Sequence, residues 1–232
     1  MLENSLTITP TQWGAIALVA LWLAIAVGLA EWLYRRQIGG PEVGRKVVHI
    51  GTGHVLLLAW WLHIPAWIGM LASVAAAIFT LVSYRLPLLP SVNGIGRKSW
   101  GTFFYAISIG VVIALCWPVD RPQYAALGIL VMAWGDGMAA LVGQRFGRHT
   151  YQWAGITKSW EGTATMAVMS FVVAAAILFG TQGWSWTTGA IALSIALVAA
   201  GLEVFSKWGL DNLTVPLASS AIALLGDRLW LP

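Results

Sequence analysis

Charged residues are scarce in this sequence, and their scarcity is the first guide to its class. Only 9% of the 232 residues are Asp, Glu, Lys or Arg, whereas 59% are hydrophobic, and the mean hydropathy is +0.77. Soluble domains carry about a quarter charged residues. A soluble core could not absorb this much apolar surface, so the composition predicts one compact membrane domain over residues 1–232.

Cysteine is almost absent too, and so are several familiar catalytic motifs. The single Cys116 excludes an internal disulfide and a cysteine-based zinc site. The sequence has no Gly-x-x-x-x-Gly-Lys-Ser/Thr phosphate loop, no soluble-kinase signature set and no His-Glu-x-x-His. The sequence carries a net charge of +4, but it contains no soluble basic module of the type that binds nucleic acids. We therefore expect no nucleic-acid partner.

Apolar segments of membrane-spanning length recur along the chain. A helix needs about 20 apolar residues to cross the hydrocarbon layer, and this length predicts about eight spans, with seven as the alternative. The second and the last spans are the weakest. The predicted spans are residues 13–33, 47–62, 65–83, 102–117, 123–143, 162–180, 187–206 and 214–230. The sequence thus predicts an all-α integral membrane protein, built as a helical bundle.

The basic residues indicate how the bundle is oriented. If the N-terminus lies outside, eleven of the thirteen Lys and Arg residues fall in connections that face the cytoplasm. Only Arg121 and Arg228 fall on the other side. The inner connections are also longer and more polar than the outer ones, so we expect the functional site at the cytoplasmic face.

Three predicted spans begin at this face behind basic residues. Residues 97–102 precede the fourth span, and the similar residues 157–163 precede the sixth span, 60 positions later. A helix N-terminus carries unpaired N–H groups and about half a positive charge, so a lysine beside it favours phosphate binding. The alternative is that the cations anchor helix ends and the hydroxyl residues cap them. The candidate phosphate-binding residues are Arg45, Lys46, Arg97, Lys98, Lys158 and Ser159.

Asp136 is the strongest single candidate for chemistry. It stands between Gly135 and Gly137 inside the fifth predicted span, about two turns from its inner end. An ionisable residue at that depth needs a cation, a basic partner or protonation, and it marks a functional site by default. The flanking glycines permit either a break in the helix or the close approach of another backbone.

Other carboxylates lie at the same face. Glu161 stands at the mouth of the sixth span, and Glu203 and Asp211 flank the connection after the seventh. These groups could neutralise nearby cations, and Asp211 could cap a helix. Carboxylates beside phosphate-binding cations are also what magnesium-assisted phosphoryl transfer requires. We interpret His54 as a packing residue and keep His49 as a residue that could support the site.

An ordered set of motifs resembles the polyprenol kinase family, which includes dolichol kinases, CTP-dependent diacylglycerol kinases and phytol kinases and is related to phosphatidate cytidylyltransferases. The resemblance covers residues 35–220 and is strongest to the phytol kinases of cyanobacteria and plastids. The motifs are Gly44-Arg45-Lys46-x-x-His49, Gly96-Arg97-Lys98-Ser99-x-Gly101-Thr102-Phe103-Phe104, Asp136-x-x-Ala139-x-x-x-Gly143-x-x-x-Gly147-Arg148, Lys158-Ser159-Trp160-Glu161-Gly162-Thr163 and Asp211-Asn212-Leu213-Thr214-Val215-Pro216-Leu217.

The resemblance implies transfer of the terminal phosphate of CTP, or of UTP, to the hydroxyl of a long isoprenoid alcohol such as phytol, in a plasma or thylakoid membrane. It implies Mg²⁺ on Asp136 and Asp211, with Glu161 on the metal or the acceptor hydroxyl. It makes Asp136, Lys158 and Glu161 the catalytic residues. The implied nucleotide-binding residues are Arg45, Lys46, Arg97, Lys98, Gly143, Arg148, Lys158 and Ser159.

Three rival functions stay open at this point. A phosphatidate cytidylyltransferase would attack the alpha phosphate and release pyrophosphate, and a diacylglycerol kinase would differ only in the acceptor. A transporter would use Asp136 and Glu203 on an ion path, with the 60-residue echo as a structural repeat. The sequence leaves the acceptor alcohol and the oligomeric state undetermined.

Overall fold

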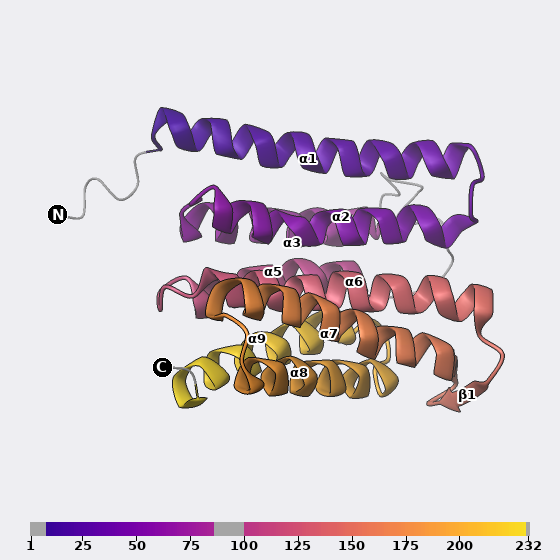
Figure 1. Cartoon of the computed structure of the whole chain (residues 1–232). Coiled ribbons are helices and arrows are strands. Elements are labelled where there is room, and N and C mark those ends of the chain that lie inside the picture. Colours follow the sequence, from indigo (N-terminus) through magenta and orange to yellow (C-terminus); the bar gives the residue numbers. More distant parts are fainter. Residues whose placement is uncertain (1–7, 86–99, 231–232) are drawn as a thin grey trace.

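The computed structural model describes residues 8–85 and 100–230, which form eight helices and one two-stranded hairpin (Figure 1). The candidates Arg97 and Lys98 lie outside the described residues. The helices are α1 (Pro10–Arg35), α2 (Pro41–Trp61), α3 (Ala66–Ser83), α5 (Gly101–Cys116), α6 (Pro122–Phe146), α7 (Trp160–Gln182), α8 (Trp186–Val204) and α9 (Asp211–Trp230). The strands are β1 (Thr150–Trp153) and β2 (Ile156–Ser159), which pair in antiparallel fashion.

Local sequence explains where most of these helices start. Thr9 and Ser185 each form a capping box ahead of α1 and α8, and Ser159 caps α7 through its hydroxyl. Proline stands in the first turn of α1, α2 and α6. These side chains satisfy or replace N–H groups that have no partner inside the helix.

The chain is an all-α membrane protein, as the sequence predicts. Among the described helices, α1, α3, α6, α7 and α8 are long and apolar enough to cross a bilayer, and α5 is a shorter apolar helix of 16 residues. The two weakest predicted spans, now α2 and α9, are not in that set. The orientation of the bundle stays a prediction.

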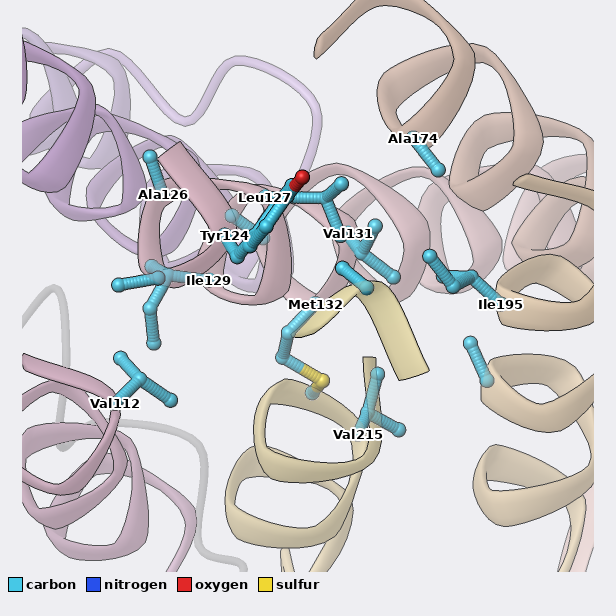
Figure 2. Close-up of a cluster of buried hydrophobic side chains, with 14 of the residues drawn as sticks. Val112, Tyr124, Ala126, Leu127, Ile129, Val131, Met132, Ala174, Ile195 and Val215 are labelled. Atoms are coloured by element: carbon cyan, nitrogen blue, oxygen red, sulfur yellow. The ribbon is translucent and has the colours of Figure 1, made fainter. Parts of the chain in front are cut away.

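Helix α6 is the centre of the bundle. In the most apolar 18-residue stretch of α6, 67% of the residues are buried, whereas 17% are buried in the corresponding stretches of α1 and α3. Figure 2 shows α6 side chains such as Ile129 and Met132 meeting residues of the neighbouring helices, including Val112 of α5 and Val215 of α9. Helices α1 and α3 therefore lie at the periphery, where their large exposed apolar side chains suit contact with lipid.

One end of the bundle carries most of the polar connections, and we call it the polar end. There α1, α6 and α8 finish and α2, α7 and α9 begin, and the β1–β2 hairpin projects from it (Figure 1). The opposite end holds the short turns between α2 and α3, α5 and α6, and α7 and α8. The helices thus alternate in direction as the predicted spans require.

The structure corrects two local predictions. Helix α2 begins at Pro41, directly after Gly40 with a φ of 81°, so Arg45 and Lys46 lie inside the helix and not ahead of its N-terminus. The β1–β2 hairpin was not expected, and its turn uses Ala154 and Gly155 with positive φ. Lys158 therefore sits on a strand, one residue before the Ser159 cap.

Candidate active site at the polar end of the bundle

Asp136 lies in an unbroken helix that two neighbours approach closely. A Cβ atom on Gly135 would lie 2.5 Å from Met166 Sδ of α7, and one on Gly137 would lie 2.8 Å from Ile50 Cδ1 of α2. The sequence left open a helix break or close helix packing as the role of these glycines. The structure shows close packing, because α6 continues through them without a break. The packing holds Asp136 where α2 and α7 meet α6.

The partner of Asp136 is Lys46. Lys46 Nζ lies 2.5 Å from Asp136 Oδ2, and the two side chains are only 2% and 17% exposed. His49 follows Lys46 by three residues on α2, and its Nε2 lies 3.4 Å from the same oxygen. A basic partner makes the carboxylate tolerable at this depth, because a buried charge needs a compensating charge close by.

Two more charged residues belong to the same group. Asp211, the first residue of α9, interacts electrostatically with Asp136, Lys46 and Lys158. Charged residues of α2, α6 and β2, which are far apart in sequence, thus lie within electrostatic range of Asp211 of α9 at the polar end. We call Lys46, Asp136, Lys158 and Asp211 the charged cluster.

Lys158 is fixed by the end of α8. Its Nζ donates to the backbone carbonyl of Glu203 and to Glu203 Oε1, the latter at 2.7 Å. Both side chains are mostly buried, at 15% and 13% exposed. This contact ties the hairpin to the end of α8. The sequence had placed both residues at this face without pairing them.

Ser159 and Gly143 pack together at the start of α7. Ser159 Oγ accepts a hydrogen bond from the Gly162 N–H at 3.1 Å, which is the N-cap role that the sequence left as an alternative to phosphate binding. A Cβ on Gly143 would lie 3.0 Å from that hydroxyl. Gly143 therefore lets α6 and α7 approach each other closely at this point.

The other candidates lie further out. Arg148 is exposed in the connection before β1. Arg45 is paired with Glu42 at 2.7 Å. Glu161 accepts hydrogen bonds from the backbone N–H of His149 and contacts His149 Nδ1 at 2.7 Å, so it holds the base of the hairpin.

The implied magnesium ion can be tested against the available ligands. Residues 8–85 and 100–230 contain no group of three or more His, Cys, Asp or Glu side chains placed to hold a metal. The structure therefore brings Asp136 and Asp211 into one cluster but leaves Glu161 with His149. A magnesium ion held by these two carboxylates alone would need phosphate oxygens and water to complete its coordination.

Sequence reasoning missed two contacts that shape this site. Glu203 was not expected to hold Lys158, because a contact between residues 45 positions apart leaves no local pattern. Lys46 was assigned to phosphate and not to Asp136. The spacing of Lys46 and His49, which places both on one helical face, was the available signal.

Comparison with known proteins identifies the family. A phytol kinase from Synechocystis sp. is 53% identical over 219 residues, which cover 94% of each chain. This chain belongs to the phytol kinase family. A probable phytol kinase from Triticum aestivum is 28% identical over 91% of this chain and 76% of the relative, and phytol kinase 1 from Arabidopsis thaliana is 26% identical over 84% and 70%.

Membership in the phytol kinase family confirms the resemblance inferred from the motifs and makes the chain a phosphotransferase with an alcohol acceptor. No family model and no solved structure matches the chain. The residue roles at the polar end therefore rest on this chain's own geometry.

Proposed function

We propose that the chain is a membrane kinase that transfers the terminal phosphate of CTP to the hydroxyl of phytol, giving phytyl phosphate, with UTP as the alternative donor. The acceptor follows the printed names of the relatives. The donor follows the motifs at 44–49, 136–148 and 158–163. The proposed enzyme works at the cytoplasmic face of a plasma or thylakoid membrane, with the polar end turned to the cytoplasm.

One observation carries this proposal: the charged cluster joins two lysines and two aspartates next to an apolar bundle. Phosphoryl transfer needs little covalent work from the protein and depends on positioning and charge stabilisation. The cluster offers both kinds of charge, and the helices around it offer an apolar environment for an isoprenoid tail. A water-soluble nucleotide and a membrane-bound alcohol can meet only at such a boundary.

The residues divide into groups that bind phosphate and groups that manage the acceptor. Lys158 and the exposed Arg148 bind the triphosphate in this proposal, with Arg45 nearer the surface. Lys46 pairs with Asp136 and fixes its orientation through the 2.5 Å contact. The acceptor oxygen forms a bond to the terminal phosphorus, the bond to the bridging oxygen breaks, CDP leaves and the hydroxyl proton is released.

Asp136 and Asp211 are the residues that would hold Mg²⁺. The ion would neutralise charge on the transferring phosphate when bound. Glu161 is a weaker candidate than the sequence implied, because it is engaged by His149 at the base of the hairpin. We keep it as a residue that places β2, and with it Lys158.

A panel of labelled nucleotides against lipid alcohols, with the detergent-purified protein, tests the proposal. CTP with phytol should give phytyl phosphate and CDP. Geranylgeraniol, farnesol and diacylglycerol identify the acceptor range, and UTP and ATP identify the donor range. Release of pyrophosphate would instead indicate a cytidylyltransferase. Absence of any nucleotide-dependent product with all of these alcohols would refute the kinase proposal.

A further inference from the structure

His49 carries a buried polar atom without a partner. Its side chain is 10% exposed, and Nε2 has no hydrogen-bond partner among the described residues. Native proteins hydrogen-bond nearly all such buried atoms, so each exception needs an explanation. His54, on the same helix, shows the usual situation: its Nδ1 contacts Ile50 O at 2.8 Å and its Nε2 accepts from Trp134 Nε1 at 3.4 Å.

The unpartnered atom points at the charged cluster. Nε2 lies 3.4 Å from Asp136 Oδ2, but the geometry is not that of a hydrogen bond. The ring is held from the side by Tyr105 of α5, whose ring centroid lies 4.4 Å away and whose hydroxyl donates to the His49 carbonyl. Packing therefore sets the ring orientation, and Nε2 is left available beside the carboxylate.

The chemistry of the surroundings selects a neutral hydroxyl as the ligand. Without a bound metal ion between them, a phosphate oxygen would meet the Asp136 carboxylate, and the nearest side-chain cation, Lys46, is already paired with it. A hydroxyl both donates and accepts hydrogen bonds, and an oxygen placed beside both atoms could bond Nε2 and Oδ2 together. A water molecule would have the same chemistry, which the experiment below separates from an alcohol.

We propose that His49 Nε2 binds the hydroxyl of the acceptor alcohol and holds it beside Asp136. This assignment rests on the proposed function for the identity of the alcohol. It makes His49 a residue that touches substrate, and it places the alcohol oxygen in the cluster where the terminal phosphate is proposed to be transferred.

The test compares His49→Phe and His49→Gln with the wild-type protein. Phenylalanine keeps the ring that packs on Tyr105 and removes the polar atom. Glutamine supplies a polar atom near the position of Nε2. We expect His49→Phe to raise the KM for phytol roughly tenfold, which corresponds to the loss of one hydrogen bond, with the KM for CTP within about twofold of wild type. His49→Gln should restore most of the loss.

His54→Phe is the matched control, because it removes a histidine of the same helix whose two nitrogens are already engaged. It should leave the KM for phytol unchanged. A His49→Phe enzyme that folds and has a wild-type KM for phytol would overturn the inference and assign the Nε2 position to water. An equal rise in both KM values, without rescue by glutamine, would overturn it as well.

Binding of phytol without nucleotide separates this inference from the proposed function. Equilibrium binding of radiolabelled phytol to the purified protein should be weaker for His49→Phe than for wild type. If the wild-type protein transfers no phosphate yet binds phytol in a His49-dependent way, the kinase proposal fails and the hydroxyl site stands. If transfer occurs and phytol binding is independent of His49, only the site fails.

Discussion

Lys46 and Asp136 form a buried ion pair. The pair is only 2.5 Å long and Lys46 is almost fully buried. From sequence, Asp136→Asn could be expected either to keep the fold, if a metal balances the charge, or to strand a basic partner. The structure supplies the partner, so the second expectation applies to the protein without bound magnesium and nucleotide.

Asp136→Asn should therefore lower the free energy of unfolding by about 3–5 kcal/mol, because it leaves the Lys46 charge buried and unpaired. The double variant Lys46→Met with Asp136→Asn removes both charges and should return the free energy of unfolding to within about 1 kcal/mol of wild type. The rate of phosphate transfer by the double variant should still be at least about 100-fold below the wild-type rate, as expected when a charged group of the site is lost.

Thermal unfolding and transfer assays on the same preparations check this prediction. A stable double variant with wild-type activity would show that the pair is purely structural. A single Asp136→Asn variant as stable as wild type would show that Lys46 does not depend on Asp136.

Lys158→Met should weaken CTP binding roughly tenfold or more, because charge-assisted hydrogen bonds to phosphate are stronger than neutral ones. Equilibrium binding of labelled CTP measures the effect. Lys207→Met is the control, since Lys207 lies over the exposed Trp208 ring at the same end of the bundle. Normal CTP affinity in Lys158→Met would leave Lys158 only its contact with Glu203.

At the scale of elements, α2 is the helix that brings Lys46 and His49 to the site, and it does so through close contacts. A Cβ on Gly51 would lie 2.6 Å from Ala26 Cβ of α1, and one on Gly53 would lie 2.5 Å from Ala133 Cβ of α6. Such distances allow no side chain without a shift of the helices. Small residues of this kind drive helix association in membranes.

Gly53→Ala should therefore destabilise the protein by about 1–3 kcal/mol and lower transfer activity, because α2 must move away from α6. Gly180→Ala in α7 is the control, since no atom of the described part of the chain lies within 4 Å of its Cβ position. That change should be neutral or stabilise by up to about 1 kcal/mol through helix propensity. Equal melting temperatures for both variants and wild type would contradict the close α2–α6 packing.

Hydropathy predicted the helix bounds well where the helix is apolar along its whole length, and poorly where the first turns of a helix carry charged residues. The predicted span 65–83 matches α3, which runs from Ala66 to Ser83. Helix α2 starts earlier than predicted because its first turns carry Glu42, Arg45 and Lys46, which pair inside the protein and look like a loop in the sequence. The β1–β2 hairpin was missed because, within residues 8–85 and 100–230, its two short strands pair with each other and with no third strand.

Part of the site was also predictable from the sequence. Asp136 stood out because charge inside a span is rare. Which cation would meet it was not predictable, because Lys46 lies 90 residues away and the contact depends on how α2 packs on α6. The N-cap role of Ser159 was readable from its position before a predicted span, whereas the Lys158–Glu203 contact required the fold.

At the scale of the whole molecule, the distribution of basic residues predicts that the polar end faces the cytoplasm. The only cysteine of the chain, Cys116, is buried, so introduced cysteines can report on sidedness without background. Gln152→Cys lies in the exposed hairpin, and Trp184→Cys lies at the opposite end, where Trp184 is 83% exposed. Membrane-impermeant maleimide added outside intact cells should label the second variant and not the first. The reverse pattern would invert the topology.

Phosphate transfer in sealed vesicles tests most directly whether the polar end is the site of chemistry. Reconstitution of Gln152→Cys inserts the protein in both orientations, and maleimide measures the fraction with its hairpin outward. CTP is charged and stays on the side where it is added. With CTP outside and phytol in the bilayer, activity relative to detergent-opened vesicles should equal the labelled fraction. Activity that follows the unlabelled fraction would place the transfer at the opposite end and contradict the proposed site.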